Sequence, residues 1–126
     1  MKVKVTPSKV HGNVKIPASK SMAHRALICA SLSDGTSIVS NVTNSKDIEA
    51  TVGCMKALGA IIKQIDETTY EVTGTNLFKQ EGNITCNANE SGSTLRFLIP
   101  LAACTNAKVK FLGQGRSVSY THLTLP

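Results

Sequence analysis

The sequence predicts an α/β fold assembled from β-α-β-α-β-β units. Short β-branched segments alternate with three longer apolar segments that have helical periodicity, and turn-forming residues separate them. Two of the short segments are close enough to form a hairpin. The chain has 126 residues, of which 41% are hydrophobic, so it can form one domain with a core.

The first half of the chain contains five predicted elements. Residues 3–6 and 13–16 alternate in polarity, and each is predicted to form a strand. Residues 21–32 are rich in Ala and Leu and predict a helix, which the following Ser-Asp-Gly turn ends. Residues 36–40 predict a strand because they alternate and are β-branched. Residues 45–58 place their apolar side chains on one helical face, and the glycine that follows is typical of a helix end.

The second half begins with a predicted hairpin. Residues 61–65 and 70–73 are strand-like and flank the turn Asp-Glu-Thr-Thr. Residues 83–87 follow a glycine and predict a further strand, and residues 108–112 predict the last one.

Residues 91–104 predict the third helix, although Pro100 lies inside it. An interior proline removes one backbone hydrogen bond and displaces the preceding turn. We therefore expect the helix to bend between Arg96 and Pro100 or to break there. We also expect this helix, which contains Phe97, to leave some apolar surface exposed.

The charge balance favours acidic ligands. Lys and Arg number 14 against 8 acidic residues, which gives a net charge of +6 and a pI near 9.3. A basic nucleic-acid-binding module is one alternative, but the three Phe and two Tyr are not interleaved with the cations as stacking platforms are. Small anionic substrates fit better. Asp47 and Glu49 are interpreted as first-turn charges that stabilise the second helix.

The cysteines indicate a reducing compartment. No Cys-x-x-Cys pair or metal-ligand spacing is present. Cys29, Cys54 and Cys104 fall in apolar helical patterns, so we expect them to be buried and reduced, and we expect a cytoplasmic protein. The N-terminus has no secretory pattern, and the longest apolar run, residues 97–104, is too short to cross a bilayer.

The most informative segment is residues 18–27, Ala-Ser-Lys-Ser-Met-Ala-His-Arg-Ala-Leu. Lys20, Ser21 and Arg25 cluster at the predicted start of the first helix. Ser21 is the expected N-cap, and a helix N-terminus with two added cations makes an anion pocket. His24 has no partner at a metal or triad spacing and is expected at the surface.

A second motif, Asn-Glu-Ser-Gly-Ser-Thr-Leu-Arg at residues 89–96, precedes the third helix. Gly92 has no Cβ, so its backbone N–H can approach a ligand closely. Ser93 belongs to the first turn. Arg96 either points to the site or braces the loop.

These two motifs resemble the substrate-binding segments of the EPSP synthase family, the 3-phosphoshikimate 1-carboxyvinyltransferases. The segments at residues 41–47 and 58–60 are also similar to that family, and the resemblance runs from about residue 10 to about residue 116. It implies the inverse α/β barrel fold of the enolpyruvyl transferases, here as a partial domain.

The resemblance implies transfer of the enolpyruvyl group of phosphoenolpyruvate to the 5-hydroxyl of shikimate 3-phosphate, a step of aromatic amino acid biosynthesis. Lys20 is expected to contact both substrates. Ser21 and Arg25 are expected to bind shikimate 3-phosphate, and Gly92 to lie beside phosphoenolpyruvate, with Ser93 and Arg96 as weaker candidates. The resemblance implies no cofactor, metal, nucleic acid or membrane partner, and a monomeric full-length enzyme.

The resemblance ends abruptly. After Arg116 the family has an Arg-Pro whose arginine binds phosphoenolpyruvate, whereas this chain has Tyr120 at that place. We therefore interpret residues 1–117 as the N-terminal part of such an enzyme and residues 118–126 as a tail foreign to the family. Family members are several-fold longer and take their catalytic carboxylates from a second domain. No catalytic residue is assigned here, and the chain alone is expected to be inactive.

Two other readings are possible. The related UDP-N-acetylglucosamine enolpyruvyl transferases have Lys-Asn where this chain has Lys20 and Ser21, and they use a loop cysteine with no counterpart here. The alternative from another class is the small basic binding module without catalysis, whose nucleic-acid affinity would fall steeply with salt.

Overall fold

A computed structural model describes residues 1–115 of the chain. It confirms the α/β class, with three helices and five strands close to their predicted positions. The elements in chain order are α1 (Lys20–Leu32), β1 (Thr36–Val39), α2 (Lys46–Ala57), β2 (Ile61–Asp66), β3 (Thr69–Thr73), a short 3₁₀ helix (Leu77–Lys79), β4 (Asn83–Asn89), α3 (Gly92–Ala102) and β5 (Lys108–Gly113).

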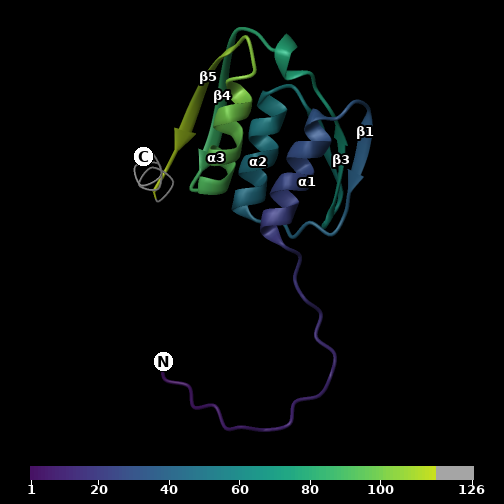
Figure 1. Ribbon diagram of the computed structural model, residues 1–126, viewed down its shortest axis with the longest axis vertical. Helices are drawn as coiled ribbons and strands as arrows, with labels where there is room; N and C mark the ends of the chain where they lie inside the picture. Colours follow the sequence, from purple (N-terminus) through teal and green to yellow (C-terminus); the bar gives the residue numbers. More distant parts are fainter. Residues whose placement is uncertain (116–126) are drawn as a thin grey trace.

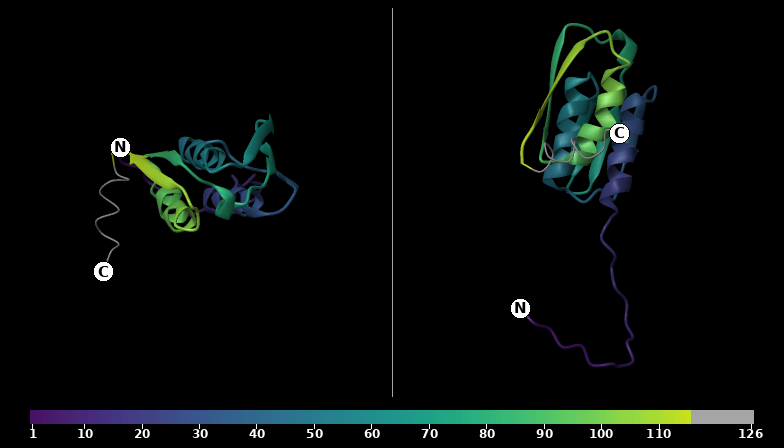
Figure 2. Two further views of the ribbon diagram at one scale, coloured as in Figure 1. Left: turned by 90° about the horizontal axis from the view of Figure 1, so that it is seen from above. Right: turned by 60° about the vertical axis from the view of Figure 1, so that its left-hand side comes forward.

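The three helices run side by side and begin at the same end of the molecule (Figure 1). Viewed from above, their axes lie at the corners of a triangle (Figure 2). One sheet has the strand order β1-β3-β2 and is antiparallel, and the other pairs β4 with β5 in parallel. The parallel pair requires a crossover, and α3 supplies it. The end of β4 is thereby placed next to the start of α3.

The predicted hairpin is confirmed by the antiparallel pairing of β2 with β3. Val72 is the middle of the sheet, opposite Ser37 on one side and Ile62 on the other. Val72 and Ile62 are buried, so this face of the sheet covers the core. Asp66 shapes the turn, because its Oδ1 accepts a hydrogen bond from the Thr68 N–H at 2.8 Å.

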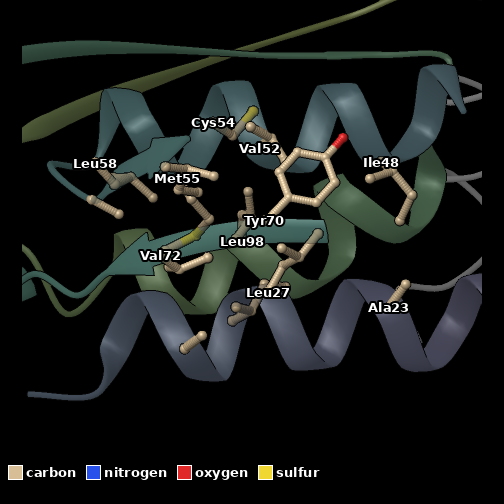
Figure 3. Close-up of a cluster of buried hydrophobic side chains, with 14 of the residues drawn as sticks. Ala23, Leu27, Ile48, Val52, Cys54, Met55, Leu58, Tyr70, Val72 and Leu98 are labelled. Atoms are coloured by element: carbon tan, nitrogen blue, oxygen red, sulfur yellow. The ribbon is translucent and has the colours of Figure 1, made fainter. Parts of the chain in front are cut away.

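The hydrophobic core is centred on α2. Ile48 and Met55 on one face of this helix and Leu58 at its C-cap are fully buried. Leu27 of α1 and Leu98 of α3 are also fully buried and belong to the same cluster (Figure 3). The apolar spacing seen in the sequence therefore does mark the packed face of α2.

A chain of hydrogen bonds crosses this core and joins the three helices. His24 Nδ1 lies 2.7 Å from Thr51 Oγ1, which lies 2.8 Å from Thr94 Oγ1. Thr94 Oγ1 in turn lies 2.6 Å from Ser91 Oγ. All four residues are buried, so the expectation that His24 lies at the surface is wrong. Burial lowers the pKa of His24, and Lys20 and Arg25 lower it further, while Asp47 opposes the shift.

The N-terminal segment departs from the prediction. Residues 3–6 and 13–16 form no strand, and the chain up to residue 19 extends away from the body (Figure 1). Val5 is 84% exposed and Val14 is 86% exposed. An alternating sequence becomes a strand only where another strand completes its hydrogen bonds, and the described residues offer this segment none.

Of the two outcomes expected at Pro100, the break does not occur, because α3 continues from Gly92 to Ala102. A bend between Arg96 and Pro100 stays a prediction. Pro100 lies near the end of the helix and on its exposed side, so water reaches the turn that lacks a hydrogen bond. The expected apolar exposure on this helix is confirmed, since Ile99 is 47% exposed.

The cysteine prediction is only partly confirmed. Cys54 and Cys86 are fully buried, whereas Cys29 and Cys104 are exposed. A hydrogen bond with Cys86, together with burial, raises the pKa of the Cys54 thiol, which keeps it protonated. Cys29 lies on the outward face of α1, and Cys104 lies in the turn after α3, a distinction that composition alone does not make.

Leu27→Ala should destabilise the chain by about 2–5 kcal/mol, because it removes a fully buried side chain and leaves a cavity. Leu32→Ala makes the same change at the end of the same helix, where the side chain is 36% exposed, and should cost much less. Urea unfolding followed by circular dichroism measures both. Equal losses would contradict the placement of the core.

His24 should make stability depend on pH. Its pKa is lowered in the folded state, so the unfolded chain binds more protons below pH 6.5. The free energy of unfolding should therefore be constant above that pH and fall as the pH drops below it. His24→Asn should flatten this dependence, whereas His11→Asn, at an exposed position, should leave it unchanged. Urea unfolding between pH 5 and pH 8 provides the measurement, and a slope that persists in His24→Asn would contradict the assignment.

Candidate functional site

Each helix begins at a serine whose side chain caps it. A cap hydroxyl accepts a hydrogen bond from an otherwise unpaired backbone N–H of the first turn. The three caps and their donors are Ser19 with Met22 N at 3.3 Å, Ser45 with Ile48 N at 3.3 Å, and Ser91 with Thr94 N at 3.2 Å. Because the helices begin at one end of the molecule, the positive ends of three helix dipoles converge there (Figure 1).

The predicted cap of α1 is wrong by two positions. Ser19 is the N-cap, and Ser21 is the second residue of the helix. The Ser-Lys-Ser sequence offers two serines, and the structure uses the earlier one, which leaves the Ser21 hydroxyl exposed and out of the cap. The backbone oxygen of Ser21 accepts a hydrogen bond from Arg25 Nη1 at 3.0 Å. Ser21 and Arg25 therefore do meet on one face of α1, as their spacing predicts.

Lys20 is the first residue of α1 and reaches across to α2. Its Nζ lies 3.2 Å from Asp47 Oδ2. The Lys20 side chain is 54% exposed and the Asp47 side chain 38% exposed, so this ion pair contributes little to stability. A more highly charged anion can displace Asp47 from Lys20 at small cost.

Arg25 connects the first motif to α3, at the residue that follows the second motif. Its guanidinium lies over the ring of Phe97 in α3, 5.2 Å from the ring centroid. This cation–π contact and the bond to Ser21 O hold an exposed side chain in place. The guanidinium is therefore oriented before any anion binds.

Gly92 is the first residue of α3 and follows directly on the cap. A Cβ built on it would meet nothing within 4 Å, so open space surrounds this position. Asn89, at the end of β4, has a φ of 48°, a left-handed conformation that asparagine tolerates. Ser93 and Arg96 are both exposed on α3, and Arg96 lies one helical turn beyond Gly92.

A cavity of about 460 Å³ opens beside these residues, between the starts of α2 and α3. Three of its lining side chains are carboxylates, so the cavity itself does not favour an anion. It is lined by Lys46, Asp47, Glu49, Asn89, Glu90 and Gln114. The cationic side chains Lys20 and Arg25 lie outside its lining, on the α1 side of Asp47.

The structure thus brings the two sequence motifs together at one end of the molecule. Lys20 contacts Asp47 of α2, and Arg25 contacts Phe97 of α3. Sequence reasoning assigned Asp47 only a first-turn role and missed its contact with Lys20, 27 residues away. The position of Asp47 in the first turn of its helix was the one available signal.

Two further observations limit the kind of site. Within residues 1–115, the structure places no group of three or more His, Cys, Asp or Glu side chains where they could hold a metal ion. None of the helices in that range is long and apolar enough to cross a membrane.

Comparison with known proteins gives a consistent result. Residues 4–117 match the family model of EPSP synthase (3-phosphoshikimate 1-carboxyvinyltransferase). The chain is 53% identical over 114 residues to the 3-phosphoshikimate 1-carboxyvinyltransferase of Clostridium perfringens strain SM101, covering 90% of this chain and 27% of the relative. It is 49% identical over 116 residues to the enzyme of that name from Clostridium kluyveri, covering 92% and 27%. The chain therefore spans about a quarter of the length of these curated relatives.

Solved structures support the fold. Two structures of EPSP synthase from Acinetobacter baumannii superpose on this chain with TM-scores of 0.69 and 0.72 at 18% sequence identity. Each superposition covers 83% of this chain and 24% of the solved one. The architecture is thus that of part of an EPSP synthase, as the sequence motifs indicate. Since the family model matches nearly the whole chain, the chain belongs to the EPSP synthase family.

Proposed function

We propose that residues 1–117 are the N-terminal part of an enzyme that transfers the enolpyruvyl group of phosphoenolpyruvate to the 5-hydroxyl of shikimate 3-phosphate. The 5-hydroxyl gives up its proton as its oxygen adds to C2 of phosphoenolpyruvate, while a proton is added to C3. Loss of inorganic phosphate from C2 and of a proton from C3 then gives 5-enolpyruvylshikimate 3-phosphate. This places the protein in the biosynthesis of chorismate and the aromatic amino acids.

The observation that carries the proposal is the meeting of both motifs at the shared end of three helices. Both substrates are polyanions, so a site that holds them together must neutralise their charge with fixed cations and N–H groups. Lys20 and Arg25 supply the cations, and the first turns of α1 and α3 supply N–H groups. The open space around Gly92 lets a phosphate approach the backbone.

Within this site we assign Lys20 to both substrates, and Ser21 and Arg25 to shikimate 3-phosphate. The exposed Ser21 hydroxyl, which the cap does not use, is free to face a ligand. We assign Gly92 to phosphoenolpyruvate, and we keep Ser93 and Arg96 as further candidates on the same helix end. No catalytic acid or base is assigned to this chain.

The same proposal covers the rest of the chain and its setting. We propose that residues 118–126, which lie outside both the family match and the described residues, do not belong to the enzyme. We further propose a cytoplasmic, monomeric full-length enzyme that needs neither nucleic acid nor a membrane. Resequencing the codons for residues 116–126 tests the tail, because a native reading frame would contradict this part of the proposal.

Lys20→Met should reduce activity in a complete enzyme. The test protein is a chimera in which residues 1–117 replace the matching segment of the Clostridium perfringens relative. Removing a fixed cation at the reacting centre should lower kcat/KM by on the order of 10²–10³-fold. Steady-state kinetics with both substrates gives the value.

Lys56→Met is the matched control for that experiment. Lys56 is an exposed lysine in the last turn of α2, at the opposite end of the helices. Its loss should leave kcat/KM close to that of the parent chimera. An inactive parent chimera, or equal effects of the two substitutions, would contradict the proposed site.

The 126-residue chain alone should show no transferase turnover, because it covers about a quarter of the length of its relatives. It should bind shikimate 3-phosphate weakly at best, with NMR shift changes confined to the first turns of α1 and α3. Phosphate release measured with both substrates present tests activity. Turnover by the purified chain would overturn the prediction.

A further inference from the structure

The hydrogen-bonded chain inside the helix triangle ends at both proposed substrate-binding motifs. At one end His24 immediately precedes Arg25, and at the other Ser91 immediately precedes Gly92. The middle member, Thr51, comes from α2, which supplies none of the proposed substrate-binding residues. Thr51 is fully buried and cannot touch a substrate.

The bonds of this chain have one consistent direction. Thr94 Oγ1 donates to the backbone oxygen of Asp47 at 3.4 Å. A hydroxyl has one hydrogen and two acceptor positions, so Thr94 must then accept from both Thr51 and Ser91. Thr51, having donated its hydrogen, accepts from His24 Nδ1–H. Each hydroxyl in the chain then donates its one hydrogen to a partner inside the protein, and this restrains the geometry of the chain.

The same chain also bears on Lys20. Asp47 receives the Thr94 bond at its backbone oxygen and holds Lys20 through its carboxylate. Each of the three proposed binding residues is therefore linked to the Thr51 hydroxyl. Lys20 is linked through Asp47 and Thr94. Arg25 and Gly92 are linked through their chain neighbours His24 and Ser91. Shifts between α1 and α3 would change the separation of the groups assigned to the two substrates.

We propose that Thr51 is a positioning residue, whose hydroxyl fixes the separation of the α1 and α3 N-termini and thereby aligns the two substrates. This rests on the proposed function. Thr51→Val keeps the volume but leaves the His24 N–H without an acceptor and deprives Thr94 of a donor. Thr51→Ser keeps the hydroxyl.

In the chimera, Thr51→Val should raise KM for both substrates and lower kcat/KM by about tenfold or more, because small misplacements of reacting groups are costly. Thr51→Ser should restore most of the activity. Ser31→Ala is the matched control: it removes a fully buried hydroxyl that bonds Leu27 O near the other end of α1. It should lower the melting temperature without changing KM.

A second readout does not depend on activity. Amide hydrogen exchange of the 126-residue chain should become faster in the first turns of both α1 and α3 in Thr51→Val, and only near the end of α1 in Ser31→Ala. If Thr51→Val lowers the melting temperature but leaves KM and the exchange at both first turns unchanged, the hydroxyl is merely structural and the proposal fails. An inactive parent chimera with faster exchange in Thr51→Val would refute the proposed function while supporting the positioning role.

Discussion

The arrangement of this protein depends on a polar constraint inside an apolar core. Burying a hydroxyl or imidazole group costs folding free energy unless the group has a hydrogen-bond partner. A helix that slid or rotated would leave several such groups without partners at once. Apolar side chains tolerate small shifts, whereas short bonds among Thr51, Thr94 and Ser91 do not. The apolar core thus determines which helix faces pack together, and the hydrogen-bonded hydroxyls determine the offset of the helices along their axes.

This alignment has an electrostatic consequence. Three capped helix starts lie side by side, and their aligned dipoles favour negative charge at that end. The carboxylates in the first turn of α2 offset part of this field, and Asp47 keeps Lys20 near α2 through an exposed ion pair. The Arg25 guanidinium gains its orientation from the Phe97 ring instead of from a carboxylate, so its charge is not cancelled. The helix end therefore has cations that are held in place yet available to an anion.

Much of the fold could be predicted from the sequence because its signals are local. The apolar face of α2 and the turn at Gly59, whose φ of 103° matches the helix-ending position, follow from spacing within a few residues. Lys20, Arg25 and Gly92 could be picked out as candidates because they lie in short motifs. What could not be predicted depends on distant contacts. The burial of His24 requires Thr51, and the partner of Lys20 is Asp47, each 27 residues away.

In the N-terminal segment a clear local pattern predicts a strand that the structure does not form. Its alternating valines give a strand pattern as clear as that of β1, yet β1 pairs with β3 and the N-terminal residues have no partner within the described chain. Periodicity specifies which side of a strand is apolar, but it cannot supply the neighbour that satisfies the backbone. Pro100 is the converse case, since α3 has enough packing through Leu98 to continue past a residue that disfavours it. In both places tertiary contacts decide between conformations that the local sequence only makes available.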